Sequence, residues 1–368
     1  MKKLKDTLID LADLFIIALF LYILLFLIGS PFGCSKSDDT AQEDIIKEMP
    51  VLDYEDDQPM QPGPDPDFVQ QEDGTQVYRT VKPLPTVITW ERLMYVDKTD
   101  SIYNSSSARS RFATYLSTYG FTGVYMYSTS GIVSSTSNYP SFASFNKALA
   151  SNGVSFRGIA SGSATTFGTT GNITKYNSSQ SDPAAKINIA NLELEWWNGV
   201  TTWSSWNSIN QQVASGSIVI NDFYEGWYKN LGTTVDTVAA RDQVRFSDRI
   251  LLHCYQNGIP TYSYANARSS GATAGRLDII AKGAQQANKV IDLYIIISAE
   301  NTAWGASNTF TGPALAAARN QINPYLYIEQ QAYNNIFGNM TAFQKQWINF
   351  RGFVWFTKRY CYAAIPPK

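Results

Sequence analysis

Short apolar runs alternate with longer amphipathic stretches from residue 86 to the end of the chain. A short apolar run bounded by turn signals predicts a buried strand, and apolar positions recurring every three or four residues predict a helix. Each run ends in polar or aromatic residues and is followed by a helical or loop stretch. We expect strands at residues 86–90, 122–128, 154–161, 191–198, 217–228, 248–256, 290–301 and 350–359.

The stretches between these strands hold the expected helices. Tyr119-Gly120 and Asn152-Gly153 are typical stop signals and close the first two. We expect helices around residues 106–118, 141–150, 182–189, 208–214, 235–246, 274–288 and 312–348.

The number and order of these units predict the fold class. Eight strand-then-helix units within residues 84–368 match the count and length of an α/β (β/α)8 TIM barrel. The runs at 248–256 and 290–301 are almost continuously apolar, as in parallel strands buried on both faces. An open α/β sheet is the alternative, but the sequence contains no glycine-rich phosphate loop to support a nucleotide-binding fold.

A hydrophobic segment precedes this barrel. Lys2, Lys3 and Lys5 stand before an apolar run at residues 14–28, which ends shortly before Cys34. We favour a signal peptide cleaved before a lipidated Cys34, because CSKSDD resembles the acidic export signal of surface lipoproteins in some Gram-negative bacteria. An uncleaved anchor is the alternative, since about 20 apolar residues span a bilayer. Both interpretations predict a membrane-anchored protein whose barrel is extracytoplasmic, at the cell surface.

Charge divides the chain into two parts. Residues 1–75 carry 16 acidic and 5 basic side chains, whereas residues 76–368 carry 15 and 24. Low hydrophobicity and a high density of like charge predict that residues 35–83 form a disordered linker. The basic side chains of the barrel are scattered and match no nucleic-acid motif, so we expect no nucleic-acid partner.

Histidine and cysteine are scarce. His253 is the one histidine and lies inside the apolar run ILLHCY, which is typical of a core histidine. We therefore expect no metal site and no cofactor. Cys254 and Cys361 are expected to be buried thiols, although a disulfide stays open at this point.

The fourth predicted strand, NLELEWWN, contains the most informative pattern. Leu192, Leu194 and Trp196 fall on one face of a strand, and Glu193 and Glu195 fall on the other. Two carboxylates on one face are costly to bury without a partner or a purpose. They form either part of a site or ion pairs with Arg or Lys inside a filled barrel.

Active sites of such barrels lie at the C-terminal ends of the strands. The predicted ends place five tryptophans and a tyrosine there as candidate sugar platforms: Trp90, Tyr127, Trp196, Trp227, Trp304 and Trp355. The carboxyl groups at the same ends are Glu193, Glu195, Asp222, Glu225 and Glu300.

Cleavage of a glycosidic bond requires two carboxyl groups, one as acid and one as nucleophile or base. Strands four and seven face each other across a barrel, so we predict Glu195 as acid/base and Glu300 as nucleophile. Glu193, Asp222 and Glu225 are expected in supporting roles, for example by setting the pKa of the acid.

The strand order and the acidic fourth strand resemble those of TIM-barrel glycoside hydrolases. NLELEWW is similar to the fourth-strand pattern of chitinases, with Glu193 and Glu195 at the spaced acid positions. The final catalytic acid of that pattern is replaced by Trp197, which argues against substrate-assisted chemistry. The larger retaining clan carries acids on strands four and seven, matching Glu195 and Glu300, although its usual Asn is Leu194 here.

Two functions follow as hypotheses. The first is a membrane-tethered glycosidase acting on an extracellular glycan. The second is a catalytically inactive barrel that binds glycan or serves as a surface assembly component. The sequence does not fix the sugar, its linkage or the oligomeric state.

Substitution of Cys34 tests the membrane assignment. We expect Cys34→Ser to abolish incorporation of labelled fatty acid in cells, because the thiol is the acylation site. An unchanged membrane fraction together with no labelling of the wild type would favour the uncleaved anchor.

Overall fold

The computed structural model describes residues 68–70, 76–78, 90–216, 218, 220–300 and 310–367. The hydrophobic segment, Cys34 and Trp304 lie outside these residues, as does most of the predicted linker. Within that linker, β1 (Phe68–Gln70) and β2 (Gln76–Tyr78) pair as an antiparallel hairpin. Among the described residues, no helix combines the length and the apolar character needed to cross a bilayer.

Eight parallel strands close into a barrel, which confirms the predicted fold class. The first and last strands pair through Gly352 opposite Glu91, so the sheet has no free edge. The strands are β3 (Glu91–Val96), β4 (Gly123–Met126), β5 (Phe156–Ser161), β6 (Ile189–Leu192), β7 (Ile220–Glu225), β8 (Arg249–His253), β9 (Ile291–Ser298) and β10 (Ile348–Phe356).

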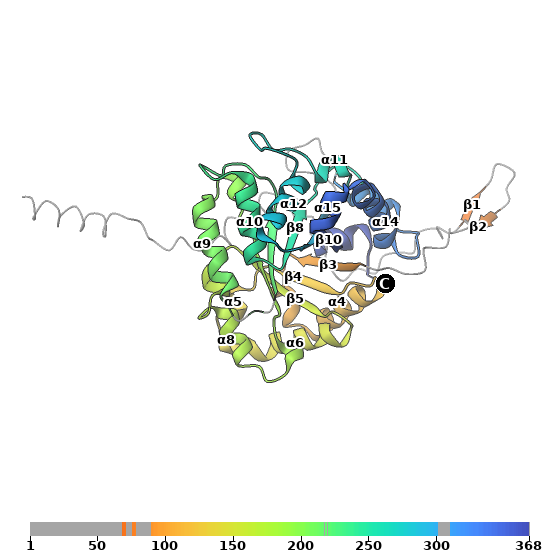
Figure 1. The fold of residues 1–368 in the computed structure, drawn as a ribbon. Helices are drawn as coiled ribbons and strands as arrows, with labels where there is room; N and C mark the ends of the chain where they lie inside the picture. The colour runs from red at the N-terminus through yellow and green to blue at the C-terminus, as the bar shows by residue number, and fades with distance from the viewer. Residues whose placement is uncertain are drawn as a thin grey trace, which may run out of the picture. The chain divides into compact units, whose positions relative to one another are not determined.

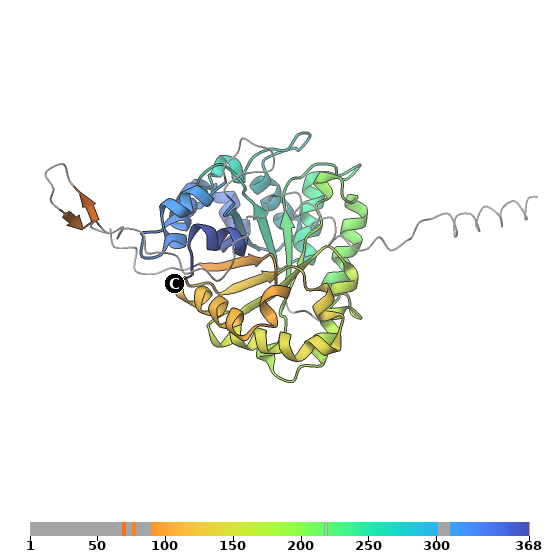
Figure 2. The ribbon, with the colours of Figure 1, turned by 180° about the vertical axis from the view of Figure 1, so that it is seen from behind.

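Helices surround these strands, as Figures 1 and 2 show from opposite sides. The longer helices are α4 (Ser106–Thr118), α6 (Tyr139–Ser151), α8 (Asn172–Ser178), α9 (Trp203–Ala214), α10 (Asp236–Phe246), α12 (Arg276–Ala287), α14 (Pro324–Ile336) and α16 (Lys358–Ala364). The shorter helices are α3 (Asp100–Tyr103), α5 (Ser130–Val133), α7 (Ala164–Phe167), α11 (Tyr262–Ala265), α13 (Gly312–Ala317) and α15 (Ala342–Trp347). Single 3-10 turns are η1 (Thr136–Asn138), η2 (Pro183–Ala185), η3 (Trp196–Asn198) and η4 (Phe337–Asn339).

Several sequence predictions need correction. In place of the helix expected at residues 182–189, the structure has the single turn η2, and β6 begins at Ile189. The fourth strand ends at Leu192 and not at residue 198, so Glu193, Glu195 and Trp196 follow the strand. The long helical segment expected at residues 312–348 is divided into α13, α14 and α15. The first strand begins at Glu91 rather than ending near Trp90, so Trp90 lies at the amino end of the barrel. The charged residues Glu91 and Arg92 made this stretch look unlike a buried strand in the sequence. In the structure Glu91 pairs with Arg351, and Arg92 pairs with Glu329.

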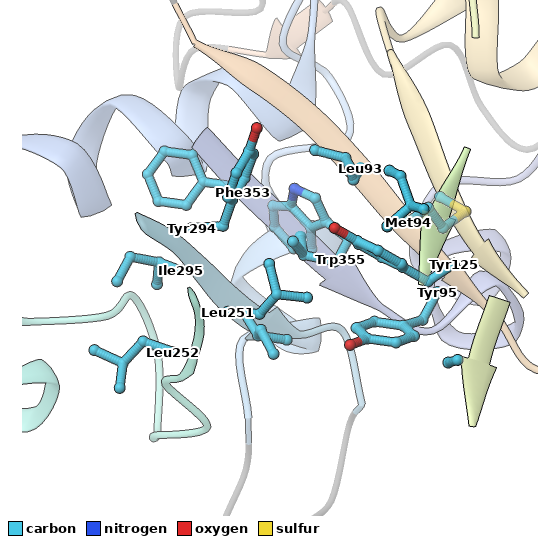
Figure 3. Packing of buried hydrophobic residues seen from close by; sticks show 14 of the residues in the cluster. Leu93, Met94, Tyr95, Tyr125, Leu251, Leu252, Tyr294, Ile295, Phe353 and Trp355 are labelled. Carbon is cyan, nitrogen blue, oxygen red and sulfur yellow. The ribbon is translucent and has the colours of Figure 1, made fainter. Parts of the chain in front are cut away.

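The barrel interior contains a buried ion pair. Arg249 on β8 donates two hydrogen bonds to Asp222 on β7, at 2.7 and 2.6 Å. The Tyr125 hydroxyl on β4 donates to the same carboxylate at 2.5 Å. Because β4 and β7 are not neighbours in the sheet, this contact crosses the interior. Aromatic rings fill the adjacent space, with Tyr95 and Tyr125 centroids 5.1 Å apart (Figure 3).

A second buried carboxylate joins the barrel to its helical layer. Glu329 on α14 accepts hydrogen bonds from Arg92 at 2.6 and 2.5 Å, from Trp90 Nε1 at 2.9 Å and from Trp355 Nε1 at 2.8 Å. Glu329 is fully buried and Arg92 is 3% exposed. This carboxylate therefore holds both ends of the closed sheet, β3 and β10, against one helix.

We expect Glu329→Ala to lower the free energy of unfolding by about 3–5 kcal/mol, because it leaves the Arg92 charge buried without a partner. Urea unfolding at neutral pH measures the loss. Lys147→Ala is the control, since it breaks the exposed Lys147–Asp182 pair and should cost less than about 1 kcal/mol. Equal losses in the two variants would contradict the importance of the Glu329 cluster.

Candidate functional site at the C-terminal mouth of the barrel

Glu193 lies just beyond β6, at the C-terminal mouth of the barrel. Its backbone N–H donates to the Ser161 carbonyl at 3.1 Å and extends the ladder between β5 and β6. Two residues earlier, the Asn191 side chain accepts a hydrogen bond from Tyr95 across the interior at 3.0 Å. The period of two along a strand therefore directs Glu193 toward the same side. There its Oε1 accepts a 2.6 Å hydrogen bond from the Tyr127 hydroxyl.

The surroundings of Glu193 favour its protonated form. Burial raises the pKa of Glu193 to about 8, against the opposing effect of the Tyr127 hydrogen bond, and the nearby Glu195 charge raises it further. The Oε2 atom has no hydrogen-bond partner among the described residues. Among the residues that the structure describes, no cation pairs with this carboxyl group in the way that Arg249 pairs with Asp222. At pH 7 Glu193 is thus a neutral carboxylic acid.

Aromatic rings line the mouth beside Glu193. Tyr127 stacks on Tyr95 with centroids 5.3 Å apart, and its edge faces Phe356 at 6.4 Å. Tyr255 packs against Phe356 at 5.4 Å and against Phe310 at 5.6 Å. Burial, followed by the Glu193 charge, raises the pKa of Tyr127 well above its usual value, so its hydroxyl remains a donor. Tyrosine and phenylalanine, rather than tryptophan, form the wall of this mouth.

Glu195 follows Glu193 and is also partly exposed. It stands at the N-cap position of η3, where its carboxylate accepts a hydrogen bond from the Asn198 side chain. Burial raises the pKa of Glu195, and the Asn198 hydrogen bond opposes this effect. The Glu195 charge in turn contributes to the raised pKa of Glu193.

Glu300 lies beyond the end of β9, at the same end of the barrel, and is 3% exposed. Its Oε2 accepts a 2.8 Å hydrogen bond from Ser298. Burial raises the pKa of Glu300, whereas Ser298 and the nearby Arg359 charge lower it. Arg359 also pairs with Asp97, with 3.6 Å between Nε and Oδ2.

The other two predicted carboxylates do not reach the mouth. Asp222 lies within β7 and is held by Arg249 inside the barrel. Glu225 is fully buried and accepts a hydrogen bond from Gln243 on α10, in the helical layer. Burial raises the pKa of Glu225 to about 8 as well, but it has no exposed surface. Alternation along β7 explains the separation, because Asp222 and Glu225 point to opposite faces.

The predicted tryptophan platforms are placed differently from the sequence expectation. Trp196 and Trp355 are fully buried. Trp196 packs edge-on against Trp197 and Trp206, with centroids 4.7 Å from each. Trp355 points to Glu329 in the helical layer.

Trp90 and Trp227 lie elsewhere. Trp90 is at the amino end of the barrel, opposite the mouth. Trp227 is partly exposed, and the Arg276 guanidinium lies 4.2 Å from its ring centroid. Tyr95, inside the barrel below the mouth, and Phe356, at the mouth, were not predicted from the sequence. Alternation along β3 and β10 is the signal that identifies them.

The thiols and the histidine are core residues. Cys254 and Cys361 are both free and buried, as predicted. Burial raises the pKa of Cys254 to about 11 and lowers that of His253 to about 3, so neither is charged at pH 7. Within the described residues, no group of three or more His, Cys, Asp or Glu side chains is arranged to hold a metal ion.

Comparisons with known proteins add little to this geometry. No protein-family model and no curated protein matches the chain. The Bacillus cereus spore cortex-lytic enzyme SleL is 11% identical, with 77% of this chain and 74% of that chain covered and a TM-score of 0.37. A GH18 chitinase from Pseudoalteromonas aurantia is 9% identical, with 73% and 93% covered and a TM-score of 0.37. A truncated 3-deoxy-D-arabino-heptulosonate 7-phosphate synthase from Thermotoga maritima is 10% identical, with 75% and 79% covered and a TM-score of 0.33.

The raised pKa of Glu193 predicts a pH-dependent stability. A glutamate in an unfolded chain has a pKa of about 4.3, so between about pH 4 and pH 8 the folded state binds the extra proton. The stabilisation of the folded state by protonated Glu193 is therefore fully present below about pH 4. It decreases as the pH rises and is lost once the pH has passed about 8.

We expect Glu193→Gln to gain stability relative to the wild type as the pH rises from 5 to 8.5. The gain should be at least about 1 kcal/mol, because one pKa unit corresponds to about 1.4 kcal/mol. Urea unfolding at both pH values measures it, with the exposed Asp100→Asn as control. A stability difference between Glu193→Gln and wild type that does not change with pH would show that Glu193 titrates normally.

Proposed function

We propose that the barrel binds a glycan at its C-terminal mouth and hydrolyses a glycosidic bond with Glu193 as general acid. One observation carries this proposal. Glu193 is a partly exposed residue at the mouth, and its buried carboxyl group has a pKa of about 8 and accepts a hydrogen bond from Tyr127. A carboxylic acid that stays protonated at neutral pH is the group required to donate a proton to a leaving oxygen.

The neighbouring groups suit the remaining steps. Glu193 donates its proton to the glycosidic oxygen while the bond from that oxygen to the anomeric carbon breaks. Glu195, the nearby carboxylate, stabilises the positive charge that develops on the sugar ring or activates the water that replaces the leaving group. Tyr127 orients the acid through its 2.6 Å hydrogen bond. The partly exposed rings of Tyr127 and Phe356 offer aromatic surface for the apolar face of a sugar ring.

The predicted pair of Glu195 as acid/base and Glu300 as nucleophile remains an alternative assignment within the same function. Both carboxyl groups follow the C-terminal ends of barrel strands. A nucleophile must be ionised, and burial raises the pKa of Glu300. In this assignment the Ser298 hydrogen bond and the Arg359 charge, which both lower the pKa of Glu300, keep Glu300 ionised.

Glycan binding without hydrolysis is the second candidate. The observation that favours it is Trp197, which replaces the final acid of the chitinase pattern and is 2% exposed in a buried aromatic cluster. A mouth without that acid retains its aromatic wall.

In both candidates the N-terminal segment, with its lysines and Cys34, is proposed to tether the barrel to the outer face of a membrane.

A glycan-array screen followed by turnover assays tests these assignments. We expect Glu193→Gln to retain binding and to reduce kcat by about 100-fold or more, the usual contribution of a general acid. Wild-type activity should fall as the pH rises through about 8, because the acid is then ionised.

Matched variants separate the alternatives. Loss of activity in Glu195→Gln and Glu300→Gln, with Glu193→Gln unaffected, would transfer the catalytic role to the predicted pair. Binding without turnover in the wild type and in all three variants would establish the barrel as a glycan-binding protein. Asp100→Asn serves as the control for carboxylate removal outside the mouth.

A further inference from the structure

A second pocket opens at the amino ends of the strands, on the opposite side of the barrel from the mouth. Its cavity volume is about 340 Å³. The lining residues come from the starts of β3, β9 and β10 and from α14, η4 and α15: Trp90, Val290, Tyr333, Phe337, Lys345, Ile348, Asn349 and Phe350. Small-molecule sites have volumes of about 300–1000 Å³, so the space suits one small ligand.

Four aromatic side chains dominate this pocket. Trp90 and Tyr333 stack with centroids 5.0 Å apart at 24°, and Tyr333 and Phe337 stack at 5.0 Å and 20°. Phe350 meets Tyr333 edge-on at 5.3 Å. All four rings are partly exposed. The rings cover part of one another, and the exposed parts of all four give the pocket an apolar lining.

The pocket is preformed. The Trp90 indole is fixed by its 2.9 Å hydrogen bond to the fully buried Glu329, which also binds Arg92. Tyr333 lies one turn of α14 beyond Glu329 and packs on the fixed indole. A ligand would meet rings already in place, which lowers the entropic cost of binding.

The barrel fold itself does not call for this open aromatic surface. Residues at the amino face of such barrels ordinarily serve stability, and stability is favoured by covering aromatic rings. An exposed apolar group of this kind usually marks a binding surface. Val290, at its edge, is 53% exposed.

The rim of the pocket carries an available positive charge. The Lys345 ammonium lies 4.9 Å from the Phe337 ring centroid and forms no ion pair among the described residues. The nearby carboxylate, Asp292, accepts a 2.6 Å hydrogen bond from Asn349 and lies 3.7 Å from Arg351. Lys345 is therefore the charged group left to meet a ligand, and it selects an anion.

We propose that this pocket binds an acidic sugar residue, with the apolar side of the sugar against the exposed parts of the aromatic side chains and the carboxylate at Lys345. A sugar ring combines an apolar face with hydroxyl groups, which Asn349 at the rim can meet. The partner is thus a uronate-containing glycan. This inference does not rest on the catalytic role proposed for the mouth.

Calorimetric titration of the full chain tests the proposal with two probes. One is an oligosaccharide of alternating glucuronic acid and N-acetylglucosamine, and the other is a neutral N-acetylglucosamine oligomer of the same length. We expect the wild type to bind the acidic probe more tightly. Tyr333→Ala should weaken that binding at least tenfold, whereas Tyr327→Ala, which removes an exposed tyrosine of the same helix, should not.

Lys345→Gln keeps the result interpretable if Tyr333→Ala unfolds, because Lys345 is exposed. It should bring the affinity for the acidic probe down to that for the neutral probe, with Lys282→Gln on α12 as control. Failure of the wild type to bind the acidic probe, or loss of binding in Glu193→Gln instead, would overturn the proposal. Self-association that Tyr333→Ala abolishes would assign the pocket to a second copy of the chain and overturn it too.

Discussion

Closure of the barrel forces polar side chains into an interior that water does not reach, and the pairing of those side chains decides the properties of the molecule. Asp222 is matched by Arg249 and held by Tyr125, so it is a structural group. Glu193 occupies the same interior side nearer the mouth and is met only by a tyrosine hydroxyl. Two carboxyl groups of one barrel thus differ in chemistry, because within the described part of the chain an arginine pairs with Asp222 and no cation pairs with Glu193.

The same constraint acts outside the strands. Glu329 compensates the charge of Arg92 and gathers two indole N–H groups from the two ends of the closed sheet. The cluster stabilises the closure, and it also fixes Trp90 at the rim of the aromatic pocket. One buried carboxylate therefore links the stability of the barrel to the shape of a surface feature.

The sequence predicted the architecture well and the mouth only in part. Parallel strands and helices are encoded by local apolar periodicity, which is why residues 106–118 were identified as a helix with the bounds that α4 has. The direction of Glu193 followed from alternation along one strand. The first strand was misplaced because Glu91 and Arg92 are charged, and their partners come from remote parts of the chain.

The tryptophans show why composition alone misled. Their number suggested sugar platforms, but whether an indole faces the mouth or the helical layer depends on strand register and on neighbouring helices. Side chains alternate along β10, and Trp355 is one of those that point outward, to the helical layer. Trp196 packs in a cluster that includes Trp206 of α9. Tyrosines, which are common and therefore less conspicuous, take their place at the mouth. Such choices depend on tertiary contacts that no local pattern contains.

Trp197 also limits what single substitutions can achieve in this barrel. Its ring lies against Gly226, where a Cβ atom would collide with the indole, and it packs edge-on against Trp196. Replacement by glutamate would leave an empty volume and an unpaired charge in one step. An acidic side chain at position 197 would need coordinated changes at Gly226 and in α9. The aromatic cluster therefore ties position 197 to the packing of β6, β7 and α9.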